Sequence, residues 1–185
     1  QVYASLRIRD RLLLGQYPSG ELFQIEEGAL ERLDGWPPVM EGVSSNAREA
    51  QTLALYGGDV YVGVWPWGEV WRRDLAEGRW QLCGRTFTHP DLTDATTHPY
   101  EEETTAVGEV LNLWGQRVTS MVPVGEWLYI STSSKGGQPF DERLEFLRGE
   151  QRQEYGAVYR YRLPGCLAAA IQYERKPTEM RSEPT

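Results

Sequence analysis

Both histidines of the chain lie in one segment, residues 84–117, and they are nine residues apart. His89 and His98 are each followed by proline, and Asp91 and Asp94 lie between them. Imidazole can act as a general base near neutral pH, and imidazole together with carboxylates can bind a divalent metal. The spacing matches no zinc signature, so the sequence favours a solvated acidic loop whose side chains cap turns. A general polar ligand site and a metal site remain the alternatives.

A second segment that could bind a ligand contains a lysine beside two glycines. Lys135 precedes the glycine pair at 136–137, inside an insertion at residues 133–155. Glycine lets the backbone approach a ligand closely, and the ammonium group can contact an anion. Apolar residues at helical spacing over 140–147 also predict a short amphipathic helix capped by Asp141. A helical lid over apolar surface is therefore favoured over an anion pocket.

Several aromatic residues accompany these polar groups. Trp65 and Trp67 flank a proline at a predicted turn, and Tyr100 and Trp114 lie in the segment that contains the histidines. Flat aromatic rings can stack on the apolar C–H faces of sugars. Tryptophans also fill the space between packed sheets, so ligand stacking and core packing are both open interpretations.

Charge and hydropathy exclude two classes of partner. The chain of 185 residues has 19 Lys and Arg against 27 Asp and Glu, a net charge of −8. Nucleic acids and anionic membranes need a basic face, which such a chain does not offer as a whole. No apolar run approaches the roughly 20 residues that span a bilayer. We therefore expect neither nucleic acid nor a membrane as a partner.

An internal repeat organises the elements that would position these residues. Residues 11–23 and 59–71 have the same hydrophobic pattern at an offset of 48. The identical residues are Gly15/Gly63, Pro18/Pro66, Gly20/Gly68 and Glu21/Glu69. A looser third copy occupies residues 127–133 and 156–161. Self-similarity at this period is typical of repeat architectures.

Each copy has the pattern of four short antiparallel strands, because apolar, β-branched and aromatic runs of about five residues alternate with Gly, Pro or Asp turns. The expected strands are Val2–Ile8, Leu12–Tyr17, Glu21–Ile25 and Leu30–Leu33; Thr52–Tyr56, Val60–Trp65, Glu69–Arg73 and Trp80–Cys83; and Val118–Val122, Leu128–Thr132, Ala157–Arg162 and Ala168–Tyr173. A four-stranded meander of just under 50 residues is the size of one β-propeller blade.

These strand motifs resemble the β-propeller superfamily, in particular the sialidase-like and other propellers without the Trp-Asp dipeptide. The resemblance implies an all-β fold with blades at about residues 1–35, 48–85 and 116–174. Insertions are expected at 86–115 and 133–155, and a polar tail at 175–185. The resemblance assigns no catalytic residue to this chain.

Three blades are too few to close a ring, because propellers have four to eight. An open arc would expose sheet faces and unpaired edges. We therefore expect further blades in the same natural chain, with self-association of copies as the alternative.

The long connections are expected to share one face, because successive turns of a meander alternate between its two ends. Function concentrates in long loops on a rigid scaffold, so this face is the predicted binding surface. The repeat also brings Arg48, Glu49 and Arg117 to the ends of inner strands on this face. The two arginines could clamp a carboxylate while Glu49 acts as acid or base, although an Arg–Glu network between blades explains the same residues.

The function that the sequence predicts is a ligand-binding propeller, with a small molecule or glycan as its partner, that is either a carbohydrate-active hydrolase or lyase or purely a binding protein. His98 or Glu49 would move the proton, with His89 as a further candidate, and Arg117 would steady an anionic group. The alternative is a non-catalytic scaffold for protein–protein interaction. No cofactor is expected, and a divalent metal between the histidines is the less favoured alternative.

Overall fold

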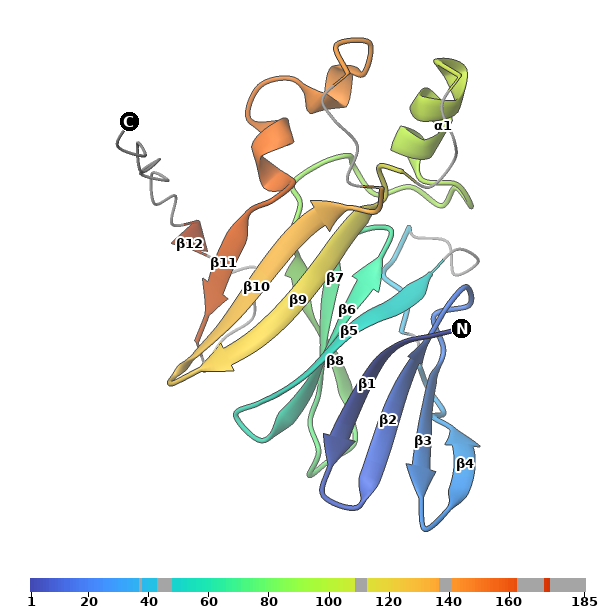
Figure 1. Cartoon of the computed structure of the whole chain (residues 1–185), viewed down its shortest axis with the longest axis vertical. Coiled ribbons are helices and arrows are strands. Elements are labelled where there is room, and N and C mark those ends of the chain that lie inside the picture. Colours follow the sequence, from blue (N-terminus) through green and yellow to red (C-terminus); the bar gives the residue numbers. More distant parts are fainter. Residues whose placement is uncertain (37, 43–47, 109–112, 137–140, 163–171, 174–185) are drawn as a thin grey trace, which may run out of the picture.

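Three four-stranded antiparallel sheets form the body of the molecule in the computed structural model (Figure 1). The model describes residues 1–36, 38–42, 48–108, 113–136, 141–162 and 172–173. The first sheet contains β1 (Val2–Ile8), β2 (Arg11–Gln16), β3 (Leu22–Glu26) and β4 (Ala29–Arg32). The second contains β5 (Glu49–Tyr56), β6 (Asp59–Trp65), β7 (Glu69–Arg73) and β8 (Trp80–Arg85). The third contains β9 (Gln116–Val124), β10 (Trp127–Ser134), β11 (Val158–Tyr161) and β12 (Gln172–Tyr173).

Strand order follows chain order within each sheet, so every sheet is a meander. The predicted all-β class is confirmed, and three successive antiparallel meanders are compatible with propeller-like blades. The short apolar, β-branched and aromatic runs and the turn residues of the sequence thus produce the strands they predict. The last predicted strand and the tail at 175–185 lie mostly outside the described residues, apart from Gln172–Tyr173.

Glycines of the repeat set how closely neighbouring sheets approach. A Cβ added at Gly15 on β2 would overlap the backbone of Ala50 on β5. A Cβ added at Gly63 on β6 would lie 2.6 Å from the Cβ of Val118 on β9. Only glycine fits at such a close approach. In both steps, therefore, the second strand of one sheet lies directly against the first strand of the next.

Two apolar layers hold the three sheets together. Leu13, Leu22 and the buried Val60 and Val62 lie between the first and second sheets. The second and third sheets enclose a separate cluster of Ala54, Tyr56, Tyr61, Val70, Cys83, Val118, Met121, Leu128, Ile130, Ala157, Tyr159 and Tyr161. Burial of apolar area at both layers stabilises the stack by about 25 cal/mol for each Å² removed from water.

The outer face of the first sheet has no sheet against it in the described part of the chain. Leu12 and Leu14 point to this face and are half-buried. Their repeat equivalents, Val60 and Val62, are completely buried against the first sheet. The outer face of the first sheet is therefore equivalent to the face of the second sheet that packs against the first.

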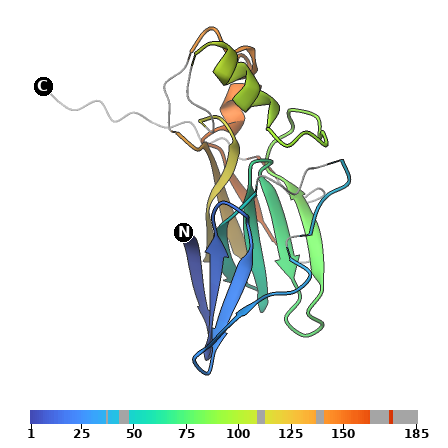
Figure 2. The same ribbon diagram turned by 90° about the vertical axis from the view of Figure 1, so that its right-hand side faces the viewer.

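Helices occur in both insertions. The α-helix α1 (Pro99–Ala106) lies in the first, where no helix was expected, and two 3₁₀ helices, Glu145–Leu147 and Gln151–Glu154, lie in the second. Asp141 does not cap a helix as predicted, because its carboxylate accepts the backbone N–H of Arg143 in a local turn. Figure 2, turned by 90°, shows α1 and the 3₁₀ helices gathered beyond one end of the sheets. Within the described residues, no helix is long and apolar enough to cross a membrane.

Candidate functional site on the long-loop face

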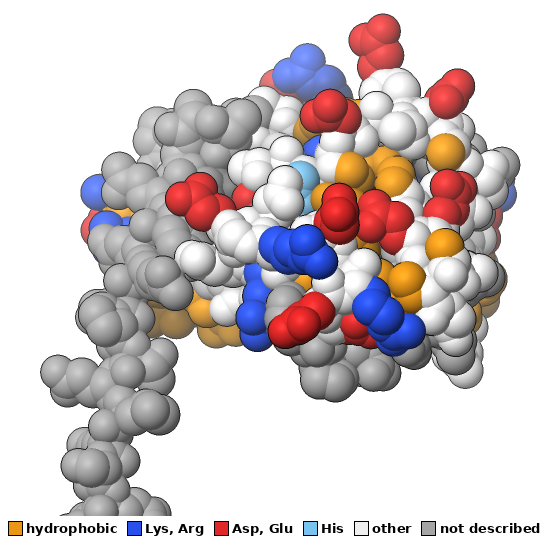
Figure 3. Space-filling model, turned by 90° about the horizontal axis from the view of Figure 1, so that it is seen from above, with side chains coloured by type: hydrophobic (Ala, Val, Ile, Leu, Met, Phe, Trp, Pro, Cys, Tyr) orange, Lys and Arg blue, Asp and Glu red, His pale blue; other side chains and the backbone are white. Residues whose placement is uncertain are grey.

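The two insertions pack together into a small cap over one end of the sheets. Their buried apolar residues form one cluster, Tyr100, Trp114, Leu144, Phe146 and Leu147. The rings of Tyr100 and Phe146 are stacked with centroids 3.8 Å apart. The cap therefore has its own core, which fixes the loops that carry His89, His98, Tyr100, Trp114 and Lys135. Figure 3 views this end from above, where acidic side chains are scattered over the surface with a few basic ones among them.

Lys135 lies where the three sheets meet. Its Nζ is 2.5 Å from Oε1 of Glu49, the first residue of β5. The same ammonium group lies 4.5 Å from the ring centre of Tyr17, which follows β2, and 4.8 Å from that of Trp65 at the end of β6. Glu49 is completely buried, whereas 17 % of the Lys135 side chain is exposed. The lysine therefore covers the carboxylate and itself faces solvent.

Arg117 extends this polar group along the third sheet. Its Nη1 donates to the backbone oxygen of Lys135 at 3.4 Å, and its Nε has no hydrogen-bond partner among the described residues. Beside it, the hydroxyl of Thr119 donates to that of Ser133 at 2.7 Å. Two cationic groups and two hydroxyls thus lie together on β9 and at the end of β10. Such a set suits an anionic or polyhydroxylated ligand.

Glu101 places a second buried carboxyl group near Lys135. One of its oxygens accepts the backbone N–H of Gly115 at 2.6 Å, and the other has no partner among the described residues. Burial raises the pKa of Glu101 to about 7, although Lys135 and the backbone hydrogen bonds act in the opposite direction. At neutral pH this carboxyl group is therefore divided between its protonated and ionised forms, as a general acid or base requires.

His89 belongs to a buried polar triad in the cap. Its Nδ1 lies 2.5 Å from the hydroxyl of Tyr100, and its Nε2 lies 3.0 Å from Oε2 of Glu154. Burial acts to raise the pKa of Glu154, but hydrogen bonds from His89 and Thr88 outweigh it and lower the pKa. The triad resembles a proton relay in its chemistry. However, His89 is only 6 % exposed and is out of reach of a ligand in solution. Its contacts with Tyr100 and Glu154 instead link the two insertions.

His98 has a structural position. It is the N-cap of α1, and its Nδ1 accepts the backbone N–H of Tyr100 at 3.2 Å. Its ring packs against Trp67, with centroids 4.5 Å apart. Burial, assisted by the nearby Arg85, lowers the pKa of His98 to about 3. The side chain is therefore neutral over the physiological range, in keeping with the turn-capping interpretation of the sequence.

Arg48 is held in a buried ion pair rather than at an open surface. Its Nη2 lies 2.6 Å from Oε2 of Glu69, which also accepts the indole N–H of Trp71 at 2.6 Å. Both charged side chains are completely buried. Burial lowers the pKa of Arg48 and raises that of Glu69, while the attraction between the two charges opposes both changes. The carboxylate clamp predicted for Arg48 is thus occupied by a carboxylate of the protein itself.

The predicted aromatic platform is taken up by protein contacts. Trp65 and Trp67 are only 4 % and 2 % exposed, and Trp114 is buried in the cap. Trp67 lies between the ring of His98 and the guanidinium group of Arg85, which is 5.4 Å from its ring centre. Core packing therefore accounts for these rings, and Tyr17 is the aromatic residue left beside the partly exposed Lys135.

The structure does not gather the residues considered for a metal. His89 and His98 are buried with the contacts described above, whereas Asp91 and Asp94 are exposed. Among the residues that the structure describes, no group of three or more His, Cys, Asp or Glu side chains is placed to hold a metal ion.

Comparison with known proteins adds no family. No protein-family model matches the chain, and no curated protein is significantly similar to it. The geometry of the site is therefore the basis on which function can be inferred.

Proposed function

We propose that this chain contributes three blades to a β-propeller, of the non-WD40, sialidase-like kind, whose long-loop face binds a polar ligand. Three successive antiparallel meanders support the propeller, the first two of them related by an offset of 48 residues. The outward face of the first sheet, which is equivalent to a buried face of the second, supports it as well. Further blades of the natural chain, or blades of another copy, would cover that face.

One observation carries the ligand site. All three sheets contribute to a single spot: Tyr17 from the first, Glu49 from the second, and Lys135 with Arg117 from the third. In a closed ring this spot would lie at the mouth of the central channel. A rigid scaffold with a few convergent polar groups is the usual form of a small-molecule site.

The ligand class that suits this spot is a carbohydrate bearing a carboxylate. Lys135 and Arg117 would contact the carboxylate, and the hydroxyls of Thr119 and Ser133 would bind sugar hydroxyls. Tyr17 would offer its ring to the apolar face of the sugar. Because Lys135 covers Glu49, the anion would compete with Glu49 for the lysine.

Hydrolase or lyase chemistry at this face would use Glu49 and Glu101 as the proton-transfer pair. Both carboxyl groups interact with Lys135, and the pKa of Glu101, about 7, suits the transfer of a proton near neutral pH. Displacement of Lys135 by the ligand would uncover Glu49. Glu101 would therefore have the proton-transfer role that the sequence predicts for His98.

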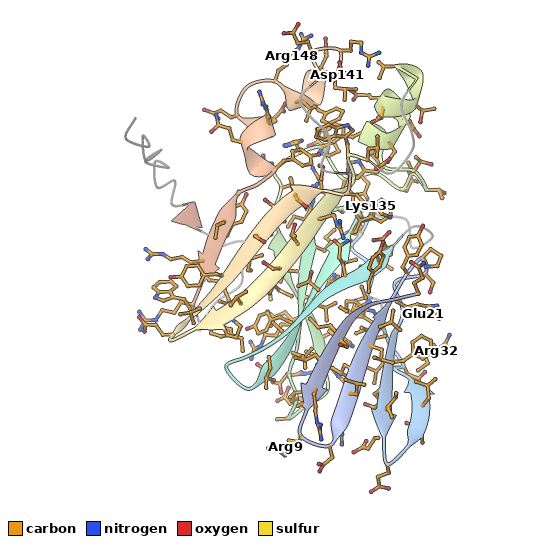
Figure 4. The ribbon with its side chains drawn as sticks, in the orientation of Figure 1. Arg9, Glu21, Arg32, Lys135, Asp141 and Arg148 are labelled. Carbon is orange, nitrogen blue, oxygen red and sulfur yellow. The ribbon has the colours of Figure 1, made fainter. Side chains whose placement is uncertain are left out.

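Binding of acidic and neutral oligosaccharides tests the ligand class. We expect oligogalacturonate to bind and the equivalent neutral oligosaccharide to bind at least tenfold more weakly, measured by calorimetry. Lys135→Gln and Arg117→Gln should each weaken the acidic ligand about tenfold. Arg148→Gln is the matched control, because Arg148 is exposed on the same cap but stands away from Lys135 (Figure 4). The proposal would be contradicted if the two sugars bound equally well, or if neither bound.

A non-catalytic protein scaffold is the second candidate. It is favoured by the internal packing of His89, His98, Trp65 and Trp67, which leaves a rigid cap with acidic residues on its surface. Such a surface suits a basic protein segment. Oligolysine is the probe: its binding should depend on exposed acids such as Glu102 and Glu142, and should be indifferent to Arg117→Gln.

A further inference from the structure

A cleft of about 700 Å³ opens between the first and second sheets. It lies around the turn between β1 and β2, where Arg9 is located, at the end of the sheets opposite Lys135 (Figure 4). Side chains from both sheets line it, together with the β5–β6 turn at Gly58. Its volume falls within the roughly 300–1,000 Å³ of small-molecule sites. It shares no residue with the proposed glycan site.

The cleft is basic although the protein is acidic. Four arginines line it, against the two carboxylates of Asp10 and Glu26, which leaves a local charge of 4 − 2 = +2 in a chain of net charge −8. The lining arginines are Arg7, Arg9, Arg11 and Arg73. Arg11 pairs with Glu26 at 2.8 Å. Within the described part of the chain, the other three arginines form no ion pair.

Arg73 has no ion pair among the described residues, and its guanidinium group lies 5.7 Å from the ring centre of Trp80. It is on β7 opposite the buried Val60, and so it faces the first sheet. Its Nε is buried and has no hydrogen-bond partner among the described residues. Burial lowers the pKa of Arg73, and the positive charge of Arg11 across the cleft lowers it further. A buried N–H without a partner and a like charge opposite would both favour binding of an oxyanion in the cleft.

The walls between the arginines are apolar. Ile8 and Leu13 come from the first sheet, and Leu55 and Leu75 from the second. Leu55 and Leu75 are 38 % and 41 % exposed, so each retains apolar surface that a ligand could cover. A bare inorganic ion would leave this surface in water, whereas a ligand with an apolar portion would bury it.

We propose that this cleft binds a small amphipathic anion, a molecule with one carboxylate or phosphate group and an apolar portion. The guanidinium groups of Arg73 and Arg9 contact the oxyanion, because a guanidinium binds carboxylate or phosphate with two parallel hydrogen bonds. The leucines of the cleft cover the apolar portion. The site stands independently of the glycan site on the long-loop face.

Octanoate and octyl phosphate are the probes, with acetate and inorganic phosphate as head groups alone. We expect at least one octyl probe to bind in calorimetry, at least tenfold more tightly than its head group. Binding should weaken when sodium chloride is raised from about 50 to about 500 mM, because screening acts on partly exposed charges. Comparison of the two octyl probes identifies whether carboxylate or phosphate is preferred.

Two variants and a control test the residues. Arg73→Gln should weaken binding at least tenfold, and Arg9→Asn several-fold; asparagine tolerates the positive φ of 54° at this turn. Arg32→Gln, an exposed arginine on the same sheet but outside the cleft, should bind like the unmodified protein. Thermal unfolding of each variant confirms that it is folded. The proposal is overturned if neither octyl probe binds at millimolar concentration, if head groups alone bind equally well, or if both cleft variants retain full affinity.

Discussion

The first and second sheets have the same repeat positions but use them differently. Glu21 and Glu69 are equivalent, yet Glu21 pairs with Arg32 at the surface while Glu69 pairs with Arg48 out of contact with water. The sheets that flank each position explain the difference: the second sheet has a neighbour on both faces, and the first has only one in the described part of the chain. A repeated residue therefore keeps its place in the strand, while its burial and energetic role depend on the neighbouring sheet.

The largest difference between the two sheets is expected at these glutamates. Glu69→Gln leaves the buried charge of Arg48 without a counter-charge and should destabilise the fold by about 3–5 kcal/mol. Glu21→Gln removes an exposed pair and should cost less than about 1 kcal/mol. Urea unfolding of both variants measures this. Equal costs would show that the first sheet is as fully covered in solution as the second.

The interface glycines should behave alike in both sheets. Gly15→Ala and Gly63→Ala each force a methyl group into a close contact with the next sheet, and each should cost roughly 1–3 kcal/mol. Chemical denaturation gives both values. If Gly15→Ala were neutral, the close approach of β2 to β5 would not exist in solution.

A smaller contrast is expected on the equivalent sheet faces. Val62→Thr buries a hydroxyl group in the apolar layer and should cost about 1–2 kcal/mol, whereas Leu14→Thr on the half-buried outer face should cost about half as much. The shift of the urea midpoint is the measurement. A larger loss at Leu14 would indicate that another sheet covers this face.

The pH dependence of stability tests the buried carboxyl group of Glu101, whose counter-charge Lys135 is partly exposed. The folded-state pKa of Glu101 is about 7, above its ordinary value of 4.5. Its contribution to stability is therefore fully present below about pH 4.5 and is lost as the pH rises to about 7. Glu101→Gln should remove this part of the decline in urea titrations across that range. Glu102→Gln, on the exposed side of the same helix, should leave it unchanged.

The sequence predicts the strands well because short apolar runs and turn residues are local signals. Val60–Trp65, for example, is a run of β-branched and aromatic residues between the turns at 57–58 and 66–68, and the structure has a strand there. The helix α1 lacks such a signal, since Pro99–Ala106 has no apolar stripe. Its capping residue His98 followed by proline was the one available indication.

Local sequence patterns do not predict the contacts of the site. Glu49 and Lys135 are 86 positions apart and meet only because the second and third sheets pack side by side. Nothing in the sequence neighbourhood of Glu101 or Tyr17 distinguishes them from other glutamates and tyrosines, and the repeat marks Glu69 as a shared position without showing that it is buried beside Arg48. The burial of Trp65 and Trp67 likewise depends on which residues of the cap lie over them.

The glycine contacts between sheets have a consequence for the shape of the whole assembly. The backbone of Gly15 contacts the backbone of the next sheet, and the backbone of Gly63 contacts a Cβ of the next sheet. Because these contacts set the spacing, we expect the angle between neighbouring sheets to depend little on the larger side chains of their faces. Those side chains can change through substitution while the curvature of the array stays constant. We therefore expect Gly15 and Gly63, rather than the larger side chains, to determine the curvature of the array.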